Sequence, residues 1–202
     1  MSEVKPVINA VRSRYLLLAL MMIPIAVVLM ASFVYFTGIG MPEGTRNKGV
    51  LIIPPQQIND LDLLDKQGMK QKIELIKESD WTFLIAHPAS CDESCRKEFW
   101  ENRQTRIALG KYQGHIRRVW LVTEGRIDEQ TQDWLSREHK DIQLLFANGD
   151  AWQKLLQQSA VDQSAAQFYL VDPRGFVMMY YSAEQTYKDV IADMKFLLKG
   201  VE

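Results

Sequence analysis

The sequence predicts an α/β domain, a sheet with flanking helices, that follows one N-terminal transmembrane helix. The first observation is an apolar run, 15–36, that contains no charged residue. The second is that, from residue 50 onward, short runs rich in branched and aromatic residues alternate with segments of helical period. This alternation is typical of an α/β sheet rather than of a helical bundle or a β-sandwich.

The apolar run 15–36 is long enough to cross a membrane, because a helix rises about 1.5 Å per residue and the hydrocarbon core of a bilayer is roughly 30 Å thick. Pro24 lies inside the run and is tolerated in membrane helices. A cleaved signal peptide is the alternative interpretation. The run is longer than the apolar core of a typical signal peptide, and no clear A-x-A cleavage site follows it.

The basic residues near the N-terminus predict the orientation of this helix. Lys5, Arg12 and Arg14 precede the apolar run, and the positive-inside rule keeps such residues in the cytoplasm. We therefore expect a cytoplasmic tail at 1–14 and a single pass through the inner (cytoplasmic) membrane. In a bacterium, the rest of the chain would face the periplasm.

The chain after the membrane helix has the composition of one tethered domain. Residues 37–49 are rich in glycine and polar residues and predict a linker. Residues 50–202 suffice for one domain with a hydrophobic core. The formal net charge of the chain is -1, with no basic patch, so we expect no nucleic-acid partner.

Six strands are expected where runs of branched and aromatic residues are bounded by turn signals. They are 50–53, 81–86, 116–123, 142–146, 168–171 and 177–181. The motif from Asp172 to Gly175, Asp-Pro-Arg-Gly, predicts a tight turn that joins the last two strands into a hairpin. A shorter hairpin is expected around 65–69.

Four helices are expected, at 91–109, 129–137, 151–157 and 184–198. Apolar residues recur at intervals of three or four in the last of them, so one face should pack on the sheet. Ser182 as N-cap, with Gln185 three residues later, predicts a capping box at its start.

The same start signal stands beside the only two cysteines of the chain. Ser90 and Glu93 are spaced as N-cap and N3 of a helix. This predicts Cys91 at the first helical position and Cys95 one turn later on the same face. Ideal helix geometry then places their Cα atoms about 6 Å apart, within reach of a disulfide.

Three kinds of chemistry are open to Cys91 and Cys95. As a redox pair, they would use the helix N-terminus to stabilise a Cys91 thiolate, although Asp92 and Glu93 oppose a further negative charge. As soft ligands, they suit Cu(I) together with a third ligand, whereas zinc would need four ligands and the chain has no second cysteine pair. As a structural staple they would stabilise little, because the closed loop is very short.

Each of the three histidines can be considered separately. His87 ends the strand that leads to the cysteines, and it is a weak candidate for a third metal ligand. A partly buried strand-end role explains it better. His115 is expected to be solvated at the start of a strand. His139 is expected to have a capping role at a helix end, where a cation suits the helix dipole.

Methionine and tryptophan residues are interpreted as packing residues. Met178 and Met179 are adjacent in a predicted strand, so one of them must face the core, and methionine fills cores readily. All five tryptophans fall within predicted strands or helices, and we interpret them as core or interface residues rather than as a binding platform. They are Trp81, Trp100, Trp120, Trp134 and Trp152.

The order of these elements resembles a thioredoxin-like domain and, more narrowly, the Sco/SenC family of membrane-anchored copper chaperones and thiol oxidoreductases of cytochrome c oxidase assembly. The resemblance covers most of 61–198. The segments that carry it are the opening hairpin at 61–73, the strand at 81–86, the C-x-x-x-C motif at 91–95, and the stretches 161–164 and 168–175.

The chain departs from the family pattern at two positions. Gln163 stands where the family carries a distal copper histidine, and Arg96 stands where proline usually follows the second cysteine. An amide oxygen is a poor Cu(I) ligand. The resemblance therefore implies no required cofactor, with copper as a possible ligand of Cys91, Cys95 and, as a weak candidate, His87.

The function that the resemblance implies is that of an accessory protein of respiratory oxidase assembly. It would act as a thiol-disulfide oxidoreductase through Cys91 and Cys95, with an oxidase subunit or another assembly factor as partner. Two alternatives stay open at this point. One is a Cu(I)-binding chaperone with an altered third ligand, and the other is a noncatalytic scaffold for assembly partners.

Overall fold

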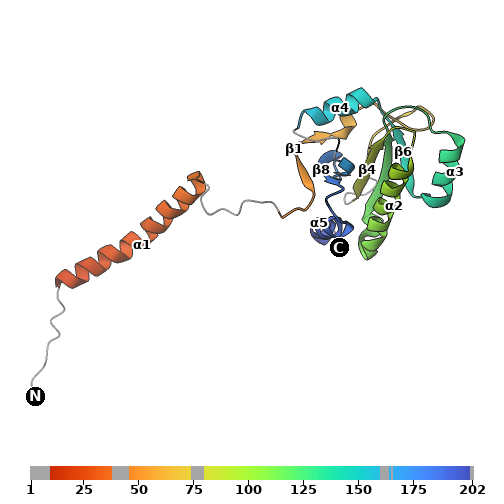
Figure 1. Cartoon of the computed structure of the whole chain (residues 1–202). Coiled ribbons are helices and arrows are strands. Elements are labelled where there is room, and N and C mark those ends of the chain that lie inside the picture. Colours follow the sequence, from red (N-terminus) through yellow and green to blue (C-terminus); the bar gives the residue numbers. More distant parts are fainter. Residues whose placement is uncertain (1–9, 38–45, 74–79, 160–163, 165, 201–202) are drawn as a thin grey trace, which may run out of the picture. The chain divides into compact units, whose positions relative to one another are not determined.

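A computed structural model describes residues 10–37, 46–73, 80–159, 164 and 166–200 (Figure 1). The chain forms two compact units, divided between Thr45 and Arg46. The first unit contains the helix α1 (Ala10–Thr37), which carries Pro24 in its interior. Its segment Arg14–Thr37 is long and apolar enough to cross a membrane, and none of this segment is buried. The predicted N-terminal apolar helix is confirmed.

The second unit is built on a single sheet of eight strands. In spatial order they run β1, β8, β7, β4, β5, β6, β2 and β3. The central strands β4, β5 and β6 are parallel, and the other pairings are antiparallel. The strands are β1 (Val50–Gln57), β2 (Leu63–Leu64), β3 (Lys70–Gln71), β4 (Trp81–His87), β5 (Ile116–Val122), β6 (Ile142–Phe146), β7 (Ala166–Val171) and β8 (Phe176–Ser182). All six strands expected from the sequence are present, and β2 and β3 form the expected short hairpin.

Both predicted hairpin turns use the same chemistry. In the turn between β7 and β8, the Asp172 side chain accepts hydrogen bonds from the backbone N–H groups of Arg174 and Phe176, each at 2.8 Å. Gly175 follows with a φ of 86°, a conformation that glycine adopts without strain. The turn between β2 and β3 repeats this arrangement with Asp65 and Gly68, whose φ is 78°. An aspartate and a glycine at these spacings explain why the turns were predictable.

Helices cover both faces of the sheet. They are α2 (Glu93–Ala108), α3 (Glu129–Glu138), α4 (Gly149–Gln157) and α5 (Tyr187–Leu197). On one face, α2, α3 and α5 pack into a common core through Phe99, Trp134 and Met194. On the other face, α4 packs through Trp152 and Leu156. The central strands are therefore buried on both sides, which explains their nearly continuous apolar sequences.

The last helix begins later than the sequence pattern predicts. Its N-cap is Thr186, which forms a capping box with Asp189. The Gln185 side chain does accept a hydrogen bond from the backbone N–H of Ser182 at 2.8 Å, but this contact belongs to a turn before the helix. The prediction of Ser182 as N-cap was therefore wrong. The capping box of Thr186 and Asp189 caps the helix instead, because the helix dipole favours the Asp189 carboxylate.

Candidate functional site

The loop between β4 and α2 brings the two cysteines together at the end of a central parallel strand. Cys91 and Cys95 form a disulfide with their Cα atoms 5.2 Å apart. This separation agrees with the value of about 6 Å expected from helix geometry. The described part of the chain contains no free cysteine.

The helix α2 begins two residues later than expected, which changes the surroundings of the cysteines. Its N-cap is Asp92 rather than Ser90, and the Asp92 side chain accepts a hydrogen bond from the backbone N–H of Cys95 at 2.9 Å. Cys91 thus lies just before the helix, not at its first position. Serine and aspartate are both strong N-caps, but the helix dipole also favours the carboxylate. A carboxylate therefore already occupies the helix end that was expected to stabilise a Cys91 thiolate.

The two sulfur-bearing residues differ in their exposure. Cys95 is 1% exposed and belongs to the core cluster that also contains Phe99. Cys91 is only partly buried and lies at the edge of that cluster. A thiol or disulfide of another protein can therefore approach Cys91 far more easily than Cys95.

Hydrogen bonds hold the cysteine loop against the neighbouring loop that follows β5. The backbone N–H of Ala89 donates to the carbonyl of Glu124 at 2.7 Å, and that of Thr123 donates to the carbonyl of His87 at 3.1 Å. The indole N–H of Trp120 also donates to the His87 carbonyl, at 3.1 Å. The sheet thus positions the chain leading to Cys91 through backbone contacts as well as through packing.

The donors present do not fit a copper ion. The two sulfur atoms are bonded to each other, so neither is a thiolate ligand. His87 lies at the end of β4, where its Nδ1 is buried and, within the described residues, makes no hydrogen bond. Among the residues that the structure describes, no group of three His, Cys, Asp or Glu side chains could hold a metal ion. Gln163, which replaces the distal histidine of the Sco/SenC pattern, lies outside the described residues.

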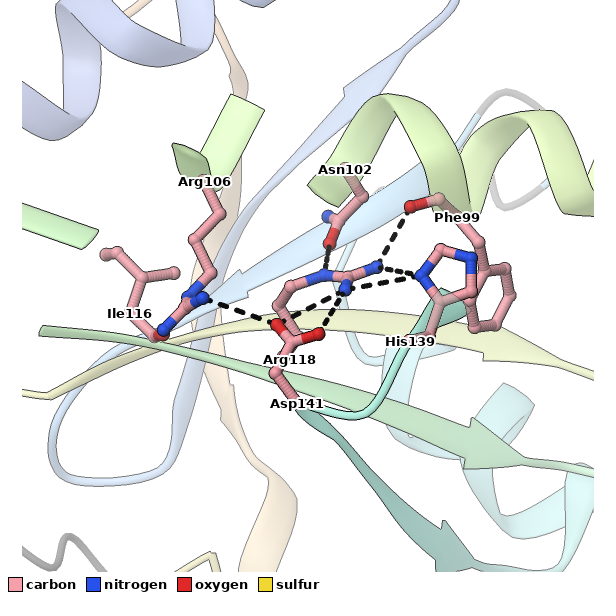
Figure 2. Close-up of polar contacts among 7 residues, drawn as sticks. All are labelled: Phe99, Asn102, Arg106, Ile116, Arg118, His139 and Asp141. Carbon is pink, nitrogen blue, oxygen red and sulfur yellow. Dashed lines mark hydrogen bonds and ion pairs between the residues drawn. The ribbon is translucent and has the colours of Figure 1, made fainter. Parts of the chain in front are cut away.

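A buried arginine, which the sequence reading missed, fastens α2 to the sheet (Figure 2). Arg118 of β5 is 1% exposed. Its guanidinium donates to the Asn102 side chain at 2.8 Å and to the carbonyl of Phe99 at 2.9 Å, both on α2. It also pairs with Asp141 at 3.1 Å. Burial lowers the pKa of Arg118, while the nearby Asp141 carboxylate opposes this effect.

The sequence does contain a signal for this arrangement. In the strand 116–122, Arg118 lies two residues after Ile116 and two residues before Trp120. Because every second strand residue points to the same face, Arg118 must point toward the same core as they do. A charged residue at such a position needs charged or polar partners to compensate for its burial. The signal predicts that partners exist, but the partners come from α2 and from the chain before β6, which local patterns cannot identify.

His139 is a neutral member of the same cluster. It forms the C-cap of α3, as its expected helix-end position implies, but it is 2% exposed and its ring lies 4.7 Å from that of Trp134. Burial and, to a smaller extent, the neighbouring Arg118 guanidinium lower the pKa of His139 to about 4. The expected capping position is confirmed, but the residue is neutral rather than a cation. His115 is also partly buried rather than solvated, with its Nδ1 3.9 Å from Asp80.

The pKa of His139 predicts acid sensitivity. The unfolded chain binds a proton near pH 6.5, whereas the folded chain binds it only near pH 4, so stability should fall as pH drops through this window. We expect a loss of about 2 kcal/mol after allowance for solvent screening. His139→Gln, which stays neutral, should flatten this part of the pH profile in chemical denaturation of the full chain. If the free energy of unfolding changed with pH in the same way for both proteins, the lowered pKa of His139 would be contradicted.

Comparison with known proteins agrees with this architecture. The family described as "Transmembrane-like, thioredoxin-like, C-terminal domain" matches residues 81–200, more than half of the chain. The chain belongs to this family. The match begins at β4 and includes the cysteine loop, α2 and all the elements that follow up to the end of α5. Among curated proteins, none matches the sequence.

Solved structures show the same thioredoxin-like fold in Sco proteins. Yeast Sco1 with copper bound is 18% identical, with a TM-score of 0.52 over 77% of this chain and 95% of that chain. The apo Sco1 protein of Thermus thermophilus is 16% identical, with a TM-score of 0.50 over 77% and 100%. BsSco, described as a member of the Sco family of cytochrome c oxidase assembly proteins, is 16% identical, with a TM-score of 0.50 over 76% and 96%. The Sco-like thioredoxin fold predicted from the sequence is confirmed.

Proposed function

We propose that this protein is a membrane-anchored, Sco-like accessory protein of respiratory oxidase assembly that acts by thiol-disulfide exchange. The observation that carries the proposal is the asymmetry of the pair, in which a partly exposed Cys91 is bonded to a buried Cys95. A staple needs no accessible sulfur. An exchange pair needs one sulfur within reach of a partner and a second one held close behind it.

The exchange begins from the reduced pair. The Cys91 thiolate attacks one sulfur of a partner disulfide, and the other partner sulfur leaves as a thiolate. The Cys95 thiolate then attacks the Cys91 sulfur of this mixed disulfide and releases the second partner thiolate. The partner disulfide gains two electrons, and the Cys91–Cys95 disulfide seen in the structure is the oxidised product. The reverse sequence would oxidise a partner dithiol.

The cellular setting follows from the anchor and from the Sco-like fold. The apolar segment Arg14–Thr37 would hold the domain at the inner membrane, with the cysteines in the periplasm. BsSco is described as a cytochrome c oxidase assembly protein, which supports an oxidase subunit or assembly factor as the partner. Copper is not required for the exchange steps. Yeast Sco1 holds copper, but the donors among the described residues of this chain do not fit that ion in the disulfide form.

Equilibration with glutathione redox buffers tests the exchange chemistry. We expect the full-length chain in nanodiscs to pass reversibly between a dithiol and a disulfide, each trapped by maleimide-polyethylene glycol and separated on gels. The Cys91→Ser, Cys95→Ser double variant provides the unmodified control. A disulfide that never opens across the range of glutathione ratios, and never forms a mixed disulfide, would identify a structural staple.

A complementation experiment tests the assembly role separately. Cells that carry only the Cys91→Ser protein should lose most of the oxidase haem absorbance in their membranes, while the amount of anchored protein stays unchanged. If the double serine variant supports normal oxidase levels, the protein is a scaffold and the exchange proposal fails. Comparison with a strain lacking the protein shows whether the assembly pathway needs it.

A further inference from the structure

A groove runs between α2 and α5, along the part of α2 that follows the cysteines in sequence. Its volume is about 620 Å³. The residues that matter for its chemistry are Glu98, Trp100 and Glu101 of α2, Phe168 of β7, and Tyr187 and Val190 of α5. The groove contains neither cysteine, so whatever binds there need not take part in the exchange chemistry.

Two aromatic side chains of this groove are unusually exposed. Trp100 is 55% exposed and Tyr187 is 57% exposed, whereas the other four tryptophans are buried. Of the core and interface roles expected for the tryptophans, Trp100 therefore does not take the core role. Exposed tryptophan and tyrosine are enriched at protein interfaces, because each combines a large apolar area with one polar group.

The groove also holds a carboxylate without a counter-ion. Within the described residues, Glu98 makes no hydrogen bond and no ion pair. Partial burial, Asp92 and Glu101 together raise the pKa of Glu98 to about 7. The one nearby cation on this wall, Lys97, lies 3.7 Å from Glu101. The wall from β7, β8 and α5 contributes apolar and uncharged polar side chains, with Tyr187 as its only titratable group.

We propose that this groove binds a segment of a partner protein in which a lysine or arginine is flanked by apolar residues. The cationic head would meet the carboxylate of Glu98, and the aliphatic stem would lie between Trp100 and Tyr187. Aromatic faces and a partly desolvated carboxylate both attract such a side chain. The flanking apolar residues would cover Phe168 and Val190.

Charge favours a protein partner over a membrane surface. Exposed aromatic residues also occur where proteins meet bilayers, but anionic headgroups attract basic residues. Here the groove presents Glu98 and Glu101, which would repel such headgroups. Because Glu98 follows Cys95 by three residues on the same helix, a segment docked in the groove would lie beside the cysteine site.

Fluorine NMR of the full-length chain in nanodiscs of neutral lipid tests this proposal. The protein carries 5-fluorotryptophan, and the Trp100 resonance is assigned by its loss in Trp100→Phe. The probes are the amidated peptide acetyl-Ala-Leu-Arg-Leu-Ala and its isostere with glutamine in place of arginine. We expect saturable shifts of the Trp100 resonance, with about tenfold tighter binding of the arginine peptide.

Variants and pH separate the cation site from general apolar binding. Glu98→Gln should weaken the arginine peptide about tenfold and leave the glutamine peptide unchanged. The arginine peptide should bind up to about tenfold more tightly near pH 8 than near pH 6, where Glu98 is mostly protonated. Phe196→Ala, an exposed residue of α5 outside the groove lining, is the matched control and should change nothing.

Three results would overturn the proposal. Equal affinity for both peptides, or full affinity in Glu98→Gln, would show that the groove does not recognise a cation. Quenching of Trp100 by brominated lipid in nanodiscs without peptide would show that this surface faces the bilayer instead. Since none of these measurements uses Cys91 or Cys95, the outcome is independent of the exchange chemistry.

Discussion

Replacement of Arg118 with methionine should lower the free energy of unfolding by about 3–5 kcal/mol. The variant keeps most of the buried apolar volume but removes every hydrogen bond that the guanidinium makes. The side-chain oxygen of Asn102 and the carbonyl of Phe99 each lose the guanidinium donor, while Asp141 keeps only its longer contact with Arg106, at 3.4 Å. Buried polar groups without partners carry the full cost of their lost hydration, and this explains the size of the effect. Urea unfolding of the full-length chain, followed by circular dichroism, measures it.

Arg117→Met is a matched control for this experiment. Arg117 directly precedes Arg118 in β5, but its buried Nε and Nη2 atoms make no hydrogen bond in the part of the chain that the structure describes. Its replacement therefore removes no such contact and should cost less than about 1 kcal/mol. Similar losses in both variants would show that Arg118 contributes only bulk, and not the tie between α2 and the sheet.

A chain that retains only Cys91 should react with a soluble aromatic disulfide roughly tenfold or more faster than a chain that retains only Cys95. The physical reason is access, because Cys95 is 1% exposed and packed in the core, whereas Cys91 is only partly buried. The single-thiol variants are Cys95→Ser and Cys91→Ser. Release of the coloured thiol gives both rates, and unfolding in urea should remove the difference between them.

The mixed disulfides of these variants supply a second comparison. Without Cys95, nothing resolves the bond between Cys91 and a partner, so Cys95→Ser should accumulate protein-bound partner on non-reducing gels. Cys91→Ser should accumulate little. Faster reaction and stronger trapping through Cys95 would reverse the assigned roles of the two residues.

Local patterns predicted the elements of this protein well but misplaced the starts of α2 and α5. The turns at Asp172 and Asp65 were predictable because the aspartate, the glycine and the reversal of direction all lie within a few residues. The caps at Ser90 and Ser182 were mispredicted because another capping residue stood nearby in each case. Asp92 and Thr186 provide the observed caps, and a spacing rule cannot rank two such neighbours.

The amino-acid sequence was enough to predict the apolar helix, the order of strands and helices, and the spacing that allows Cys91 and Cys95 to form a disulfide. These features follow from composition and period within single segments. The three-dimensional fold was needed to show which cysteine is accessible, how the charge of Arg118 is compensated, and that Glu98 and Trp100 share a groove with α5. Burial and charge pairing depend on segments far apart in the chain, and no local pattern contains that information.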